Sequence, residues 1–144
     1  MIQINSNTQI YQPIKRVFDF ISTPENDFQW QYGTLASTRM PESKAGLGGC
    51  FQSTGLIMGH RYQGTFEVTE FEPNSRYGFK SLSGPLLSFT TYALEIVRGS
   101  TEVKFCMQAN VVHWMDSNEN VLEKKMKKQL KENLAMLKTI LETG

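Results

Sequence analysis

The residues best suited to chemistry in this chain are two histidines and two cysteines. His60 lies at the tip of a predicted hairpin and His113 near the end of a predicted strand, while Cys50 and Cys106 each lie in a predicted strand. A histidine that acts as a general base needs a partner within hydrogen-bond reach and a group that orients its ring. Neither neighbourhood in the sequence supplies such a pair. We therefore expect ordinary surface or interface histidines, with a catalytic role as the alternative.

The same four residues argue against a metal centre or a disulfide framework. No two of them lie within a short metal-ligand spacing, and two cysteines are too few to form such a framework. Simple alternation places Cys106 on the polar face of its strand, opposite Phe105 and Met107, so we expect unreactive thiols rather than activated nucleophiles. We accordingly expect neither a metal site nor a cofactor.

Two further features could bind phosphate or nucleic acid, and both have a simpler interpretation. The glycine-rich segment 46–49 is not followed by a predicted helix, which a phosphate-binding loop requires, so we interpret it as a mobile rim. Five lysines lie opposite the apolar face of the last predicted helix, with glutamates among them, which is typical of a solvated face: Lys124, Lys125, Lys127, Lys128 and Lys131. Lys and Arg number 15 against 14 Asp and Glu, a net charge of +1, so we expect no nucleic-acid partner.

A larger group of side chains could hold a small apolar molecule. Pockets for such molecules combine an aromatic and aliphatic lining with a few polar groups. The aromatic and methionine side chains predicted to face inward would form such a lining: Tyr62, Phe66, Tyr77, Phe79, Tyr92, Phe105, Met107 and Met126. Gln129 and Asn133 could add polar contacts from the last helix, and Arg61 could reach a carboxylate at the mouth. The alternative is that these rings fill one another as a solid core.

Strands must position most of these side chains, and alternation of polar and apolar residues predicts where the strands lie. The predicted strands are a first one with Ile2 and Ile4 inward, then 34–39, 50–56, 62–71, a short one holding Tyr77 and Phe79, 88–97 and 101–112. Tyr92, Leu94 and Ile96 are predicted to share the inward face of their strand. Turn residues separate these segments, as at 57–60, 72–75 and 98–100. Long alternating strands joined by short turns predict an antiparallel sheet with one buried face.

Two short helical segments are predicted between the first two strands. The first follows Pro13 and ends before Pro24, and its inward residues are Val17, Phe18 and Ile21. Residues 24–30 indicate a second helical turn, with Phe28 and Trp30 as buried anchors.

The C-terminal segment changes to helical periodicity. Apolar residues follow one another at steps of three or four: Leu122, Met126, Leu130, Leu134, Leu137 and Leu141. Residues 116–119 resemble a capping box that begins at Asp116. Because a wide apolar sheet face must be covered, this helix is its natural partner. The sequence thus predicts an α+β fold, a curved antiparallel sheet of about six or seven strands wrapped around a long C-terminal helix.

Length and composition fit one domain spanning residues 1–144. The chain is 40% hydrophobic and 20% charged, which argues against disordered and fibrous classes. No apolar run is long enough to span a membrane, and the first ten residues lack the pattern of a secretion signal. We therefore expect a cytoplasmic monomer or homodimer without integral membrane association.

Several segments together resemble the SRPBCC (START-like) superfamily, in particular its polyketide cyclase/dehydrase-like branch. They are residues 13–26 followed by Trp30, residues 66–77, Gly84-Pro85, the strand with Tyr92, and residues 133–142, in the order and spacing of that superfamily. The resemblance covers nearly the whole chain. It implies a helix-grip fold with a ligand cavity under the long helix, but no catalytic residue, because members share no catalytic motif.

Three functions follow from this resemblance. The favoured one is binding of a small hydrophobic or aromatic molecule, such as a lipid, by a carrier or sensor. The alternatives are a polyketide cyclase/dehydratase-like enzyme that uses the same cavity, and a partner-binding domain like the co-chaperone members. A ligand cavity would need roughly 300 Å³ or more, and we expect its mouth to be rimmed by residues 46–49 and the hairpin tip 57–60.

Overall fold

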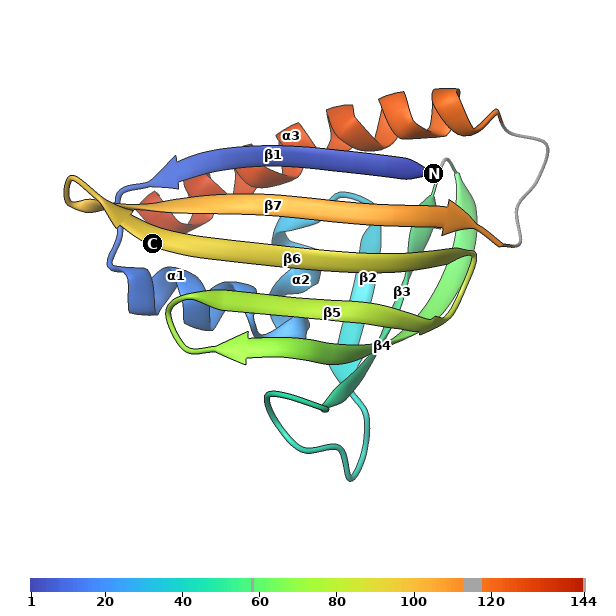
Figure 1. Ribbon diagram of the computed structural model, residues 1–144, viewed down its shortest axis with the longest axis horizontal. Coiled ribbons are helices and arrows are strands. Elements are labelled where there is room, and N and C mark those ends of the chain that lie inside the picture. The colour runs from blue at the N-terminus through green and yellow to red at the C-terminus, as the bar shows by residue number, and fades with distance from the viewer. Residues whose placement is uncertain (58, 113–117, 144) are drawn as a thin grey trace.

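A curved sheet of seven antiparallel strands wraps around one long helix in the computed structural model, which describes residues 1–57, 59–112 and 118–143 (Figure 1). The strands are β1 (Ile2–Ile10), β2 (Thr34–Arg39), β3 (Cys50–Ile57), β4 (His60–Glu72), β5 (Arg76–Ser83), β6 (Leu86–Val97) and β7 (Ser100–Val111). Their order across the sheet is β1-β7-β6-β5-β4-β3-β2. The predicted helix-grip fold is therefore confirmed.

The strand register sets inward side chains side by side in rows that cross the sheet. One row runs through Ile4, Met107, Thr90 and Phe79, which pair in succession from β1 to β5. The next row runs through Phe105, Tyr92, Tyr77 and Phe71 and consists of aromatic rings. On the other side of the first row, a third row passes through Ile2, Ala109 and Ser88. The side chains of Ala109 and Ser88 are small. These three rows form the floor of the interior.

The short helices lie between β1 and β2, as predicted. They are α1 (Ile14–Ile21), a 3₁₀ turn (Pro24–Asn26) and α2 (Asp27–Trp30). The inward residues of α1 are buried as expected, and so is Trp30. Phe28, in contrast, is 57% exposed, so its predicted anchoring role is wrong. Positions two apart on a helix project about 200° apart, so α2 can turn only one of these rings inward.

Helix α3 (Glu119–Thr143) lies across the concave side of the sheet and carries the predicted apolar stripe. Five of its leucines are buried, and Met126 is half-buried: Leu122, Leu130, Leu134, Leu137 and Leu141. The five lysines of its outer face are exposed, as expected. The proposed cap Asp116 lies outside the described residues. Where the described helix begins, the Asn118 side chain accepts a hydrogen bond from the Asn120 N–H at 2.8 Å.

Two strand details differ from simple alternation. Ile96 is 68% exposed although it is predicted to face inward; it lies near the end of β6, beyond Ala93, where the pairing with β5 ends. In β4 the register shifts between Val68 and Glu70, and this bulge turns Phe71 inward against Phe18, with ring centroids 5.4 Å apart. Within the described residues, no helix combines the length and apolar character required to cross a membrane.

Candidate ligand-binding site

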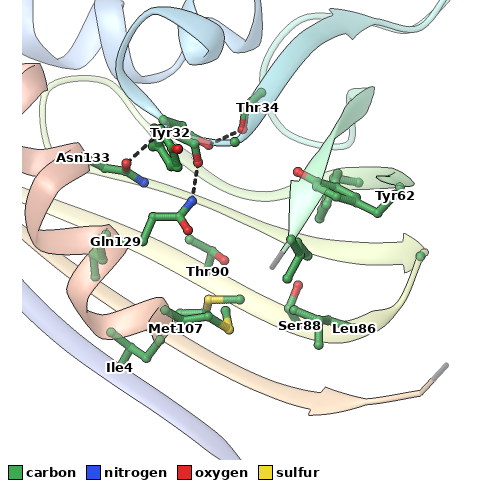
Figure 2. Close-up of a pocket in the computed structure, with 18 of the residues that line it drawn as sticks. Ile4, Tyr32, Thr34, Tyr62, Leu86, Ser88, Thr90, Met107, Gln129 and Asn133 are labelled. Carbon is green, nitrogen blue, oxygen red and sulfur yellow. Dashed lines mark hydrogen bonds between the residues drawn. The ribbon is translucent and has the colours of Figure 1, made fainter. Parts of the chain in front are cut away.

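A partly open cavity of about 200 Å³ lies between α3 and the sheet. Its floor is the row that contains Met107 and Thr90, with Phe105 and Tyr92 beside it. Its roof is α3, through Met126, Gln129, Leu130 and Asn133. The segment 30–34 and the 83–86 turn close its sides, and Figure 2 shows Tyr32 and Tyr62 near its mouth.

Inward side chains of β6 and β7 become smaller toward one end of the sheet. Ala109 and Ser88 occupy paired positions where the next rows carry Met107 and Phe105 on β7 and Tyr92 on β6. The Ser88 backbone N–H also donates a hydrogen bond to Oγ of Ser81 at 2.8 Å, so a third small residue adjoins them. Of these three small residues, Ser88 lines the cavity, together with Thr90 and the half-buried Met126 of α3.

Nine of the ten predicted lining residues face this cavity. They are Tyr62, Phe66, Phe79, Tyr92, Phe105, Met107, Met126, Gln129 and Asn133. The exception is Tyr77, which stacks on Tyr92 with ring centroids 6.2 Å apart and lines a separate, much smaller void. Whether the nine contact a ligand stays a prediction.

Two expectations about the mouth and one about the size of the cavity are wrong. The glycine segment 46–49 does not border the cavity, and Gly46 and Gly49 instead line the small void beside Tyr77. Arg61 is exposed and is not part of the lining. The volume is also below the 300 Å³ that we expected of a ligand site. The hairpin tip does contribute, through Ile57.

The two amides of α3 are engaged in holding the mouth rather than free. Oδ1 of Asn133 accepts a hydrogen bond from the Tyr32 N–H at 2.8 Å, and Nε2 of Gln129 donates to the Tyr32 carbonyl (Figure 2). On the other side, the Gly33 carbonyl accepts a hydrogen bond from the Leu56 N–H at 2.7 Å. Gly33 has φ +93°, and an added Cβ would lie 2.7 Å from the Leu56 carbonyl oxygen, so only glycine fits between β3 and α3. Residues 31–33 are thus clamped at the mouth from both sides.

Sequence reasoning missed the polar wall of the cavity. Ser88 and Thr90 face inward from β6, where they share a face with Tyr92 and Leu94. The sequence did contain a signal for this wall: Ser88 and Thr90 continue the alternating inward positions of Tyr92 and Leu94, so two hydroxyl residues stand where apolar residues would be expected. The contribution of segment 30–34 had no such signal, since it depends on contacts with distant α3.

No aspartate, glutamate, histidine, lysine or arginine of the described chain lines the cavity. The buried carboxyl nearest to this region belongs to Asp27 of α2. Burial, then the charge of Glu25, raises the pKa of Asp27 well above its usual range, against a hydrogen bond with Ser37. Burial, then the charge of Asp27, likewise raises the pKa of Tyr92. Tyr92 is therefore a neutral phenol at physiological pH.

The residues that opened the sequence analysis lie away from this cavity. Cys106 faces the outer side of the sheet beside Lys104, Cys50 borders the small void, and both are free thiols. His60 is exposed at the start of β4, and His113 lies outside the described residues. Within the described part of the chain, no cluster of His, Cys, Asp or Glu could hold a metal ion.

Comparison with solved structures finds the same fold in distant proteins. A START superfamily protein from Mycobacterium smegmatis superposes with a TM-score of 0.80 at 11% identity, over 99% of each chain. The Aha1 dimer structure from Colwellia psychrerythraea gives 0.66 at 20% identity, over 99% of this chain and 97% of that one. The di-domain ARO/CYC protein BexL from the BE-7585A biosynthetic pathway gives 0.73 at 14% identity, over 96% of this chain and 46% of that one. These identities support a shared fold only.

No curated protein matches the sequence. A protein family does, over residues 1–142, and its description is Polyketide cyclase / dehydrase and lipid transport. The seven-stranded sheet, the long α3 and the cavity between them agree with that match. The chain belongs to the polyketide cyclase / dehydrase and lipid transport family.

Proposed function

We propose that this protein binds a small hydrophobic or aromatic molecule in the cavity under α3, as a cytoplasmic carrier or sensor. The observation that carries the proposal is a partly open cavity whose described lining is mostly apolar and holds no charged side chain. Burial of apolar surface stabilises such a complex by roughly 25 cal/mol for each Å² removed from water. With a volume of about 200 Å³, the site suits a molecule of one or two rings better than a long-chain lipid.

The enzyme alternative receives less support from the lining. General acid–base catalysis needs a group whose pKa lies near the working pH. The only ionisable groups on the described lining are tyrosines, and the pKa of Tyr92 is raised further by burial and by Asp27. The partner-binding alternative is favoured by a filled interior, which the cavity argues against.

The first experiment is native mass spectrometry of the purified protein, compared with a denatured sample. We expect a small molecule that is retained only in the native sample. If a ligand is added and is then released with an altered mass, for example after loss of one water, the result would instead support the enzyme alternative.

The second experiment measures uptake of the neutral fluorescent probe N-phenyl-1-naphthylamine. Met107→Trp should fill the cavity and abolish probe uptake, because Met107 lies on the cavity floor. Met136→Trp is the matched control, because Met136 is exposed on α3 and should leave uptake unchanged. Thermal melting checks that both variants fold. If the wild-type protein takes up no probe, or Met107→Trp folds and still takes it up, the proposal fails.

A further inference from the structure

Two hydroxyl side chains stand together on the cavity wall formed by β6. Thr90 is 6% exposed and Ser88 is 4% exposed, and alternation along the strand turns both to the concave side. Thr90 pairs with Met107 and with Phe79, both of which line the cavity. Figure 2 shows Thr90 and Ser88 along the same wall as Met107, with Gln129 extending from α3 above them.

Among the described residues, no hydrogen bond is made by the side-chain oxygen of Ser88 or Thr90, and neither oxygen is among the fully buried polar atoms without a partner, so both are accessible from the cavity. The bond at Ser88 uses its backbone N–H, which donates to Ser81, and leaves its own Oγ unpaired. Among the other polar groups of the lining, Thr34 donates a hydrogen bond to Gln31, whereas Nε1 of Trp30 is buried without a partner in the described chain and could add a donor. A hydroxyl that is accessible from the cavity can exchange its hydrogen bond with water for a hydrogen bond with a ligand oxygen.

The charge of the lining restricts the ligand further. Because no charged side chain of the described chain borders the cavity, nothing would compensate a buried carboxylate or ammonium group. Hydroxyls both donate and accept hydrogen bonds, so a neutral carbonyl or hydroxyl oxygen is the complementary group.

We infer that Ser88 and Thr90 form the polar subsite of the cavity and select a neutral, mainly apolar ligand that carries a carbonyl or hydroxyl oxygen. This inference rests on the proposed function and specifies the chemical class of its ligand. The oxygen lies against β6, and the apolar body of the ligand packs on Phe79, Phe105 and Met107.

The test compares three bicyclic probes that share one carbon skeleton: tetralin, 1-tetralone and tetralin-1-carboxylate. Their dissociation constants are measured by calorimetry or ligand-observed NMR with the full chain. Thr90→Val and Ser88→Ala should each weaken 1-tetralone binding by about fivefold to tenfold, the range expected for one lost hydrogen bond. Tetralin should bind all variants within about twofold of wild type, because it makes no such bond. The carboxylate should bind the wild type at least about tenfold more weakly than 1-tetralone.

Thr91→Val is the matched control. Thr91 lies next to Thr90 on β6 but faces the outer side of the sheet, so its substitution should leave all three affinities unchanged. Should Thr90→Val fail to fold, Ser88→Ala carries the same comparison.

The outcomes separate this inference from the function on which it rests. If tetralin binds but neither variant weakens 1-tetralone selectively, the subsite is overturned while cavity binding stands. Equal binding of the carboxylate and the ketone would overturn the requirement for a neutral ligand. If no neutral probe binds the wild type, the proposed function fails and the subsite fails with it.

Discussion

The interior of this protein has two ends that share the same sheet and the same helix but are packed differently. At the closed end, which we define as α1 together with α3 from Leu134 onward, Phe18 meets Phe71 and the leucines of α3 are fully buried. At the open end, the part of the interior beneath α3 from Leu122 to Asn133, the cavity separates Met126 from Ser88 and Thr90. The strands of β6 and β7 run through both ends without interruption. The two ends therefore differ in what fills the space between α3 and the sheet: α1 and large side chains at the closed end, and smaller side chains at the open end.

This comparison assigns stability to one end and binding to the other. Large rings and leucines at the closed end bury apolar surface and hold the fold together. At the open end, the small side chains of Ser88 and Thr90 bury less apolar surface, and the cavity beside them has room for a ligand. Substitutions that exchange the two kinds of residue test the assignment.

The largest effect is expected from truncation at the closed end. Leu134→Ala should lower the free energy of unfolding by roughly 2–5 kcal/mol, because it removes buried methyl groups and leaves a void. Met126→Ala should lower it by roughly half of this or less, since Met126 is half-buried and already borders open space. Urea denaturation of both variants measures the difference. Equal losses would show that the two ends are packed alike.

Periodicity in the sequence is sufficient to predict the closed end. The leucine stripe of α3 and the alternation along β6 and β7 reflect burial of one face, which is a property of each element by itself. The predictions failed where burial depends on neighbours. Phe28 and Trp30 lie on opposite sides of α2, so only one of them can be buried, and Ile96 lies past the end of the pairing with β5.

The open end is harder to predict, because a cavity forms where side chains from several elements do not fill the space between them, and no single element's sequence shows this. The large residues of its lining followed from the apolar pattern, and the resemblance supplied the gap beneath the helix. Ser88 and Thr90 were not predicted, because a small hydroxyl side chain at an inward strand position does not distinguish a cavity wall from an ordinary sheet face. The clamped segment 31–33 depends on hydrogen bonds to residues about 100 positions away, which no local pattern encodes.

An intermediate effect is expected from substitution of Asp27, a buried residue that affects the pKa of two tyrosines. Burial, then Asp27, raises the pKa of Tyr77, which borders the small void, and Asp27 also raises the pKa of Tyr92, which lines the cavity. Because burial raises its own pKa, the folded protein keeps Asp27 protonated at a pH where the unfolded chain has lost that proton. This contribution to stability is complete below the unfolded pKa of about 3.9 and is lost as pH rises through the folded pKa.

Asp27→Asn should remove this pH dependence. Between pH 4 and the raised pKa, the stability of the wild type should fall relative to the variant by up to about 1.4 kcal/mol per pH unit. Urea midpoints of both proteins at a series of pH values measure this. Glu25→Gln is the control, since Glu25 is the second cause of the raised pKa and its loss should only shorten the pH range over which stability falls. Parallel pH profiles for wild type and Asp27→Asn would contradict a buried, protonated carboxyl.

The smallest effect is expected at the mouth of the open end. Asn133→Ala removes the acceptor of the Tyr32 N–H, but Tyr32 is exposed and water can replace the amide oxygen. Stability should therefore fall by about 1 kcal/mol or less. The change should appear instead in local opening, as faster hydrogen exchange of the Tyr32 amide and faster association of N-phenyl-1-naphthylamine. Glu132→Ala, at the exposed neighbouring position of α3, should change neither rate. Unchanged exchange at Tyr32 in Asn133→Ala would mean that Gln129 and the Gly33–Leu56 hydrogen bond hold the mouth without Asn133.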